Sequence, residues 1–184
     1  MTLTVQVAQA AAELAAGAAG TRTEDLADLV EELVVARRIV AFGCGREGLM
    51  MRALTMRLHH LGLDVHYVGD MSCPPVELGD LLLVSSGPGD LPTVAALLGQ
   101  AKKAGARTAC VTAQPDGPDP KACDVVLTIP AQTMADDTGS TALLPMGSVF
   151  EGAQFLIFEI LVLVLRDRLG ETADSMRHRH TNLE

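Results

Sequence analysis

Short, uninterrupted apolar runs alternate along this chain with longer stretches in which apolar residues recur at helical spacing. The apolar runs predict strands at residues 38–43, 64–68, 80–86, 107–112 and 124–129. The amphipathic stretches predict helices at residues 3–17, 24–36, 46–61, 91–105, 148–169 and 172–179. Continuous apolar strands that alternate with helices are typical of a parallel sheet covered on both faces. We therefore predict one α/β domain over residues 1–184, doubly wound, with N-terminal helices in 1–36 and a C-terminal helical tail in 171–184.

Two of the predicted helices carry further signals. Thr23 is expected to be the N-cap of the second helix, because the acidic residues Glu24 and Asp25 follow it in the first turn. The helix at 148–169 is apolar on nearly all sides, which requires burial on more than one side. In a domain of this size, we expect part of that helix to lie between the subunits of a homo-oligomer.

Composition and charge narrow the class of protein. Of the 184 residues, 48% are hydrophobic but only 3% are aromatic, so the core is expected to consist of Ala, Leu, Val, Ile and Met. The net charge of −9 argues against nucleic acid as a partner, because a surface that binds phosphates needs clustered Lys and Arg.

Three further features of the sequence indicate in which cellular compartment the protein is found. The four cysteines show neither zinc-ligand spacing nor a redox pair. No positively charged side chain precedes Arg22, so the N-terminus lacks the charged start of a secretory signal. The longest apolar stretch, 155–165, is interrupted by Glu159 and is shorter than the roughly 20 residues that span a bilayer. We expect a cytoplasmic protein with reduced thiols and no membrane partner.

Two predicted strands run directly into glycine-rich loops. Residues 38–42 lead into the loop 43–48, and residues 81–85 lead into the loop 86–90, with a predicted helix after each. In an open parallel sheet, ligands bind at the carboxyl ends of the strands. Glycines there allow close approach of the backbone, and the N–H groups at a helix start suit an anion. The two loops predict a pocket for a small, anionic molecule.

Each candidate catalytic residue also has an interpretation in which its role is purely structural. Glu151 lies in the first turn of the predicted helix 148–169, which follows a loop at about 131–146. It is either a general base at the pocket rim or the capping-box partner of Ser148 as N-cap. His180 is part of a solvated tail, or pairs with His178 toward a metal, although no third ligand has convincing spacing. Cys44 has no identifiable activating base, so we expect it to line the loop.

An ordered set of motifs resembles the sugar isomerase (SIS-domain) family and, within it, the 6-phospho-3-hexuloisomerases. The similarity is collinear from about residue 38 to the last residue. Its motifs are Gly43-x-Gly45-Arg46-x-Gly48, Met56-Arg57-Leu58-x-His60-Leu61-Gly62, Gly79-Asp80-Leu81-Leu82 with Ser86-Gly87-x-Gly89, Pro145-Met146-Gly147-Ser148-x-Phe150-Glu151 and Met176-Arg177-x-Arg179-His180-x-Asn182-Leu183-Glu184. Each glycine motif alone is weak evidence for the family, but the ordered set is specific to the 6-phospho-3-hexuloisomerase branch.

The resemblance implies a five-stranded parallel sheet of flavodoxin-like type, and dimers that pair into a tetramer. It implies intramolecular aldose–ketose or ketose–ketose isomerisation of a phosphosugar through an enediolate, without metal or organic cofactor. Glu151 matches the position of the family's base, and His180 that of a histidine often supplied by a neighbouring subunit. The substrate-binding residues implied by the two loops and the helix that follows are Gly45, Arg46, Glu47, Ser86, Gly87, Gly89, Asp90 and Thr93.

Three residues depart from the family pattern and keep other functions open. The family's phosphate loop commonly reads Ser-Gly-Ser-Gly-Glu-Thr, whereas Pro88 removes a hydroxyl and an N–H here and Leu91 removes another hydroxyl. Glu47 stands where the family has Ser, and it places an anion where phosphate needs donors. Two alternatives to a phosphosugar isomerase follow. One is a non-catalytic SIS module that binds a sugar derivative, and the other is an isomerase whose sugar lacks phosphate or carries a cation.

Overall fold

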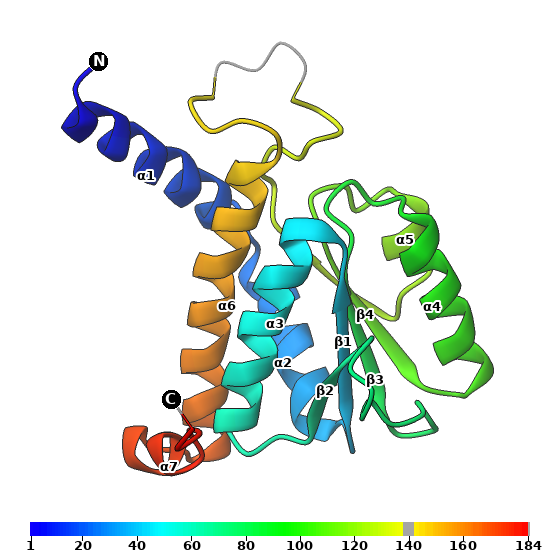
Figure 1. Ribbon diagram of the computed structural model, residues 1–184. Helices are drawn as coiled ribbons and strands as arrows, with labels where there is room; N and C mark the ends of the chain where they lie inside the picture. Colours follow the sequence, from blue (N-terminus) through cyan, green and yellow to red (C-terminus); the bar gives the residue numbers. More distant parts are fainter. Residues whose placement is uncertain (138–141, 184) are drawn as a thin grey trace.

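The computed structural model describes residues 1–137 and 142–183. A five-stranded sheet runs through the protein, and Figure 1 shows helices on both sides of it. The strands are all parallel and lie in the order β2-β1-β3-β4-β5. Their bounds are β1 Ile39–Gly43, β2 Val65–Tyr67, β3 Leu81–Ser85, β4 Arg107–Thr112 and β5 Val125–Thr128. This order is that of flavodoxin-like doubly wound sheets. The predicted fold class and all five predicted strands are therefore confirmed.

Helices cover both faces of the sheet. Their bounds are α1 Leu3–Ala19, α2 Thr23–Val35, α3 Gly45–His60, α4 Pro92–Lys103, α5 Pro118–Lys121, α6 Ser148–Leu169 and α7 Ala173–His178. The helices α2 and α3 pack against α6 on one face of the sheet, and α4 and α5 lie on the other, as Figure 1 shows. The short helix α5 was not among the predicted elements, because a single turn between prolines has no periodicity to recognise.

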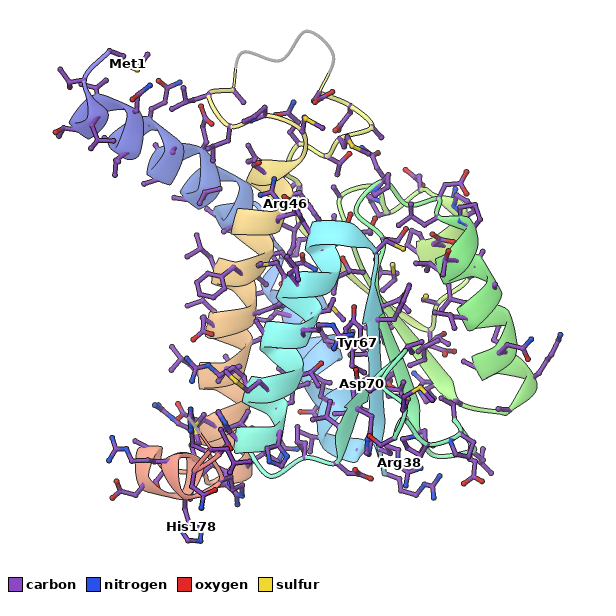
Figure 2. All side chains as sticks on the ribbon, viewed as in Figure 1. Met1, Arg38, Arg46, Tyr67, Asp70 and His178 are labelled. Carbon is purple, nitrogen blue, oxygen red and sulfur yellow. The ribbon has the colours of Figure 1, made fainter. Side chains whose placement is uncertain are left out.

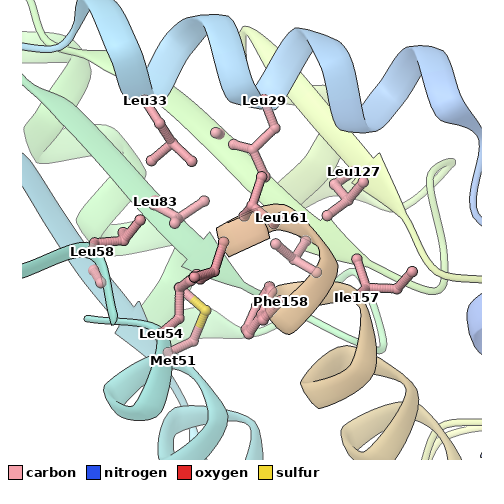
Figure 3. Packing of buried hydrophobic residues seen from close by; sticks show 14 of the residues in the cluster. Leu29, Leu33, Met51, Leu54, Leu58, Leu83, Leu127, Ile157, Phe158 and Leu161 are labelled. Atoms are coloured by element: carbon pink, nitrogen blue, oxygen red, sulfur yellow. The ribbon is translucent and has the colours of Figure 1, made fainter. Parts of the chain in front are cut away.

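Alternate residues of each strand enter two different cores, because successive side chains of a strand point to opposite faces. Ile39, Leu81 and Leu83 join the larger core with α2, α3 and α6, part of which Figure 3 shows. Val40 and Leu82 join the smaller core under α4. Burial on both faces explains why the strands read as unbroken apolar runs.

Helix α6 is the central helix of the larger core and contacts α1, α2 and α3. By length and composition alone this helix could cross a membrane, yet half of its apolar 18-residue window is buried inside the protein. Its outward side nevertheless leaves four large apolar side chains 41–48% exposed, namely Phe155, Ile160, Leu163 and Val164.

The structure corrects two expected helix caps. Arg22, not Thr23, is the N-cap of α2, and Thr23 is already helical. Gly147, with φ of +80°, is the N-cap of α6, so Ser148 is the first helical residue and forms no capping box with Glu151. A left-handed turn at Gly147 replaces a side-chain cap, and this leaves the side chain of Glu151 available for other contacts.

Candidate functional site

A cavity of about 410 Å³ lies where the carboxyl ends of the strands meet the starts of α3 and α6. Its wall is mainly apolar, with one cation and two carboxylates. The lining residues are Cys44, Gly45, Arg46, Glu47, Pro88, Leu91, Thr133, Met134, Ala135, Met146, Gly147, Phe150 and Glu151. A concave apolar site with a few convergent polar groups at this edge of a parallel sheet is typical of small-molecule binding.

Arg46 and Glu151 form an ion pair across the cavity wall. Arg46 Nη2 lies 2.9 Å from Glu151 Oε2, and Arg46 Nη1 donates to Ser148 Oγ at 3.0 Å. Figure 2 shows Arg46 close to the start of α6. Glu151 Oε2 makes no hydrogen bond within the described residues, so Arg46 holds it by charge alone. Burial raises the pKa of Glu151, Arg46 opposes that shift, and Glu47 adds to it.

The second carboxylate, Glu47, is bound to the loop after β3. Its Oε2 accepts hydrogen bonds from Ser85 Oγ at 2.6 Å and from Gly87 N–H at 2.9 Å. Burial raises the pKa of Glu47, although the two hydrogen bonds oppose that shift. One predicted loop thus supplies a carboxylate to the other, and both belong to the same cavity.

A third carboxylate, Asp119 of α5, supports the same loop from behind. Its Oδ2 accepts hydrogen bonds from Ser86 Oγ at 2.6 Å and from Leu91 N–H at 2.8 Å. Asp119 is buried, and sequence analysis did not single it out. No local signal could have identified it, because its role depends on α5 lying against the loop 86–91.

Gln154 is a further residue that sequence analysis missed. It is fully buried on α6 and donates from Nε2 to Ser85 Oγ at 2.9 Å. It lies one turn after Glu151, and a lone amide on an otherwise apolar stretch of helix was a signal that could have found it. Gln154 therefore links α6 to the hydroxyl that binds Glu47.

The structure brings only some of the predicted site residues to the cavity. Gly45, Arg46, Glu47 and Glu151 line it, whereas Ser86 and Gly87 lie behind the wall and contact Asp119 and Glu47. Gly89 packs against Gln114 and Gly117, where an added Cβ would come within 2.8 Å of the Gln114 carbonyl oxygen. Asp90 and Thr93 are exposed and do not line the cavity. Their binding roles stay predictions.

His180 lies at the opposite end of the molecule from Glu151. Arg179 fixes the tail there, because it donates to both oxygens of Glu171 and to the carbonyl oxygen of His60. The imidazole rings of His60 and His180 are 5.1 Å apart, at the end of α3 remote from Arg46. Helix α3 has 16 residues and is therefore about 24 Å long. Figure 2 shows the neighbouring His178 far from Arg46. One chain alone does not join His180 to Glu151.

Cys44 borders the cavity as a lining residue. Burial raises the pKa of its thiol, and the carboxylates of Glu47 and Asp119 raise it further. A thiol in that setting is a poor nucleophile. Within residues 1–137 and 142–183, no group of three or more His, Cys, Asp or Glu side chains could hold a metal ion.

The sheet order and the cavity together define a doubly wound α/β protein with a cavity suited to a small molecule at the carboxyl ends of its strands. The chain belongs to the SIS domain family, whose model matches residues 32–150. The family prediction is therefore confirmed.

Relatives within the family carry a more specific name. The 3-hexulose-6-phosphate isomerase of Mycobacterium gastri is 40% identical over 94% of this chain and 86% of its own length. The 3-hexulose-6-phosphate isomerase of Bacillus subtilis is 31% identical over the whole of both chains. A solved hypothetical protein from Methanococcus jannaschii, with the inferred function of 3-hexulose-6-phosphate isomerase, has a TM-score of 0.79 and 27% identity over 88% of this chain and 86% of its own.

Proposed function

We propose that this protein is an intramolecular sugar isomerase that acts, like the relatives named above, on a hexulose 6-phosphate. The observation that carries the proposal is the Arg46–Glu151 pair at the cavity wall, since a carboxylate base is the group that the reaction needs. The conversion of 3-hexulose 6-phosphate into fructose 6-phosphate moves a carbonyl from C3 to C2. It requires removal of the C2 proton, an enediolate, and return of a proton to C3.

Glu151 suits the role of base for a physical reason. Its side chain is only 13% exposed, and burial makes the carboxylate more basic, while Arg46 keeps it ionised. The Arg46 guanidinium is 58% exposed and lies beside the space in which the enediolate oxygens would develop charge. A cation next to a developing oxyanion lowers the energy of that intermediate.

The proposal includes His180 as a second catalytic group, supplied by another copy of the chain. Its distance from Glu151 within one chain requires such an arrangement. The exposed apolar side chains of α6 support an assembly of dimers or of a tetramer, because a face of that kind is stabilised by a partner. We place the enzyme in the cytoplasm, and the proposed chemistry needs neither metal nor organic cofactor.

Proton exchange with solvent tests the proposal directly. Fructose 6-phosphate incubated with the enzyme in D₂O should gain deuterium at C3, as NMR would show, because in the reverse direction the base takes the C3 proton. Glu151→Gln should reduce that exchange by roughly 100-fold or more, the range usual for a general base. Glu159→Gln is the matched control, because Glu159 forms a similar pair with Arg57 further along the same two helices, at 3.3 Å. Equal exchange by the wild type and Glu151→Gln would refute the role of Glu151.

A second candidate function is favoured by one observation. The Glu47 carboxylate already accepts the Gly87 N–H, which supports an isomerase of a sugar without phosphate. The same exchange assay separates the candidates when fructose is compared with fructose 6-phosphate. Binding of either sugar without exchange would instead indicate a non-catalytic SIS module.

A further inference from the structure

The end of β3 forms an anion seat, which we define as the hydroxyl of Ser85 and the N–H of Gly87. Both groups donate to a single atom, Oε2 of Glu47, at 2.6 and 2.9 Å. A backbone N–H beside a hydroxyl, at the carboxyl end of a parallel strand, is the kind of donor set that binds carboxylates and phosphates. In this chain, the anion seat is occupied by a carboxylate of the chain itself.

The surroundings hold Glu47 firmly in the anion seat. Gln154 donates to Ser85 Oγ at 2.9 Å, so the one hydroxyl hydrogen of Ser85 is directed to Glu47. The other oxygen of Glu47, Oε1, lies against the Gly87 backbone, where an added Cβ would come within 2.7 Å of it. Only glycine leaves room for the carboxylate at this position. An external anion would therefore have to take the space that Glu47 fills.

Most other donors of the loop 86–91 are already engaged in hydrogen bonds within the protein. Ser86 Oγ and Leu91 N–H donate to Asp119, and Gly89 N–H donates to the Ser86 carbonyl oxygen. Pro88 has no N–H to donate. A phosphate group bound at the anion seat would thus have to use the donors that Glu47 now holds.

The charges that line the cavity also oppose the binding of a phosphate group. Glu47 and Glu151 both line it, and Arg46 is already paired with Glu151 at 2.9 Å. A phosphate monoester carries a charge of about −1.5 to −2 at neutral pH. Close to an ionised Glu47 it would meet a like charge in partly buried surroundings, where the repulsion is weakly screened. The ionised carboxylate and a phosphate group therefore exclude each other from this space.

We propose that Glu47 is an internal competitor for the phosphate group of the substrate, and that it sets how strongly the site prefers phosphorylated over unphosphorylated sugars. A phosphosugar binds only when the Glu47 carboxylate leaves the anion seat. This inference rests on the proposed isomerase function for the identity of the sugar, but not for the contacts of Glu47.

Calorimetry with fructose 6-phosphate and fructose tests the inference on the full-length protein. Glu47→Gln keeps the size of the side chain and removes its charge, and Glu47→Ser empties most of the anion seat. Both variants should bind fructose 6-phosphate at least tenfold more tightly than the wild type, which corresponds to about 1.4 kcal/mol. Their affinity for fructose should change less than twofold. Asp116→Asn is the control, because it makes the same change in net charge at a 98% exposed position, and it should leave both affinities unchanged.

The outcomes separate cleanly once thermal unfolding shows that the variants are folded. A gain for fructose 6-phosphate in both Glu47 variants, not shared by fructose, supports internal competition. Unchanged or weaker binding of fructose 6-phosphate, an equal gain for fructose, or no binding by any variant would overturn it. Because calorimetry needs no turnover, failure of the isomerase proposal would appear separately, in the exchange assay with Glu151→Gln.

Discussion

Asp119 supports the loop that follows β3, and its removal should be costly. In Asp119→Ala, the buried hydroxyl of Ser86 and the N–H of Leu91 lose their acceptor. A buried donor without a partner costs about 1–3 kcal/mol, so two such donors cost about 2–6 kcal/mol. We expect a loss close to 3 kcal/mol, because the substitution also removes a carboxylate whose Oδ1 has no hydrogen-bond partner within the described residues. For a chain of this length, that loss lowers Tm by roughly 6–12 °C.

Urea unfolding with fluorescence or circular dichroism measures this loss as a lower midpoint at an unchanged slope. Asp116→Ala is the matched control, since the side chain of Asp116 is 98% exposed and pairs with Lys121 at 3.5 Å. It should change the free energy of unfolding by no more than about 0.5 kcal/mol.

The reasoning also predicts that Asp119 and Ser86 are coupled. Once Asp119 is absent, Ser86→Ala removes a donor that already lacks its partner, so the double variant should be no less stable than Asp119→Ala. A double-mutant cycle should therefore give a coupling of about 1–3 kcal/mol. Strict additivity, or a loss below about 1 kcal/mol in Asp119→Ala, would refute the view that Asp119 holds this loop.

Two further predictions concern pH and assembly. Burial raises the pKa of Glu47 above its ordinary value of 4.5, so the folded protein binds that proton more tightly than the unfolded chain. The stability that this proton contributes is fully present below pH 4.5, and it is lost as pH rises through the pKa of Glu47 in the folded protein. Urea titrations from pH 4.5 to 8 should show this slope in the wild type, and a slope of the same size in Glu47→Gln would contradict it. Ile160→Glu places a charge at a 48% exposed position of α6, so light scattering should show a smaller assembly than that of the wild type, with little loss of monomer stability. A wild type that is already monomeric would exclude the α6 interface.

Much of the fold follows from the sequence, because a strand buried on both faces is apolar at most of its positions. Leu81–Ser85 is such a strand, and its neighbours along the chain alternate with amphipathic helices. The positions of Arg46, Glu47 and Glu151 at one edge also follow, since loops at the carboxyl ends of parallel strands meet there. By contrast, Thr23 and Ser148 were wrong as caps, because capping depends on the turn that precedes the helix.

The sequence by itself determined the sheet, the family and the edge at which the cavity lies. The anion placed by Glu47 near a phosphate loop was also visible in it. Only the tertiary structure showed that this carboxylate accepts hydrogen bonds from Ser85 and Gly87. It also showed that Asp119 accepts hydrogen bonds from Ser86 and Leu91, in the same loop. These contacts join residues 28–40 positions apart in the chain. Local patterns encode which residues are buried, but pairings between distant polar groups are set by how helices and loops pack around the sheet.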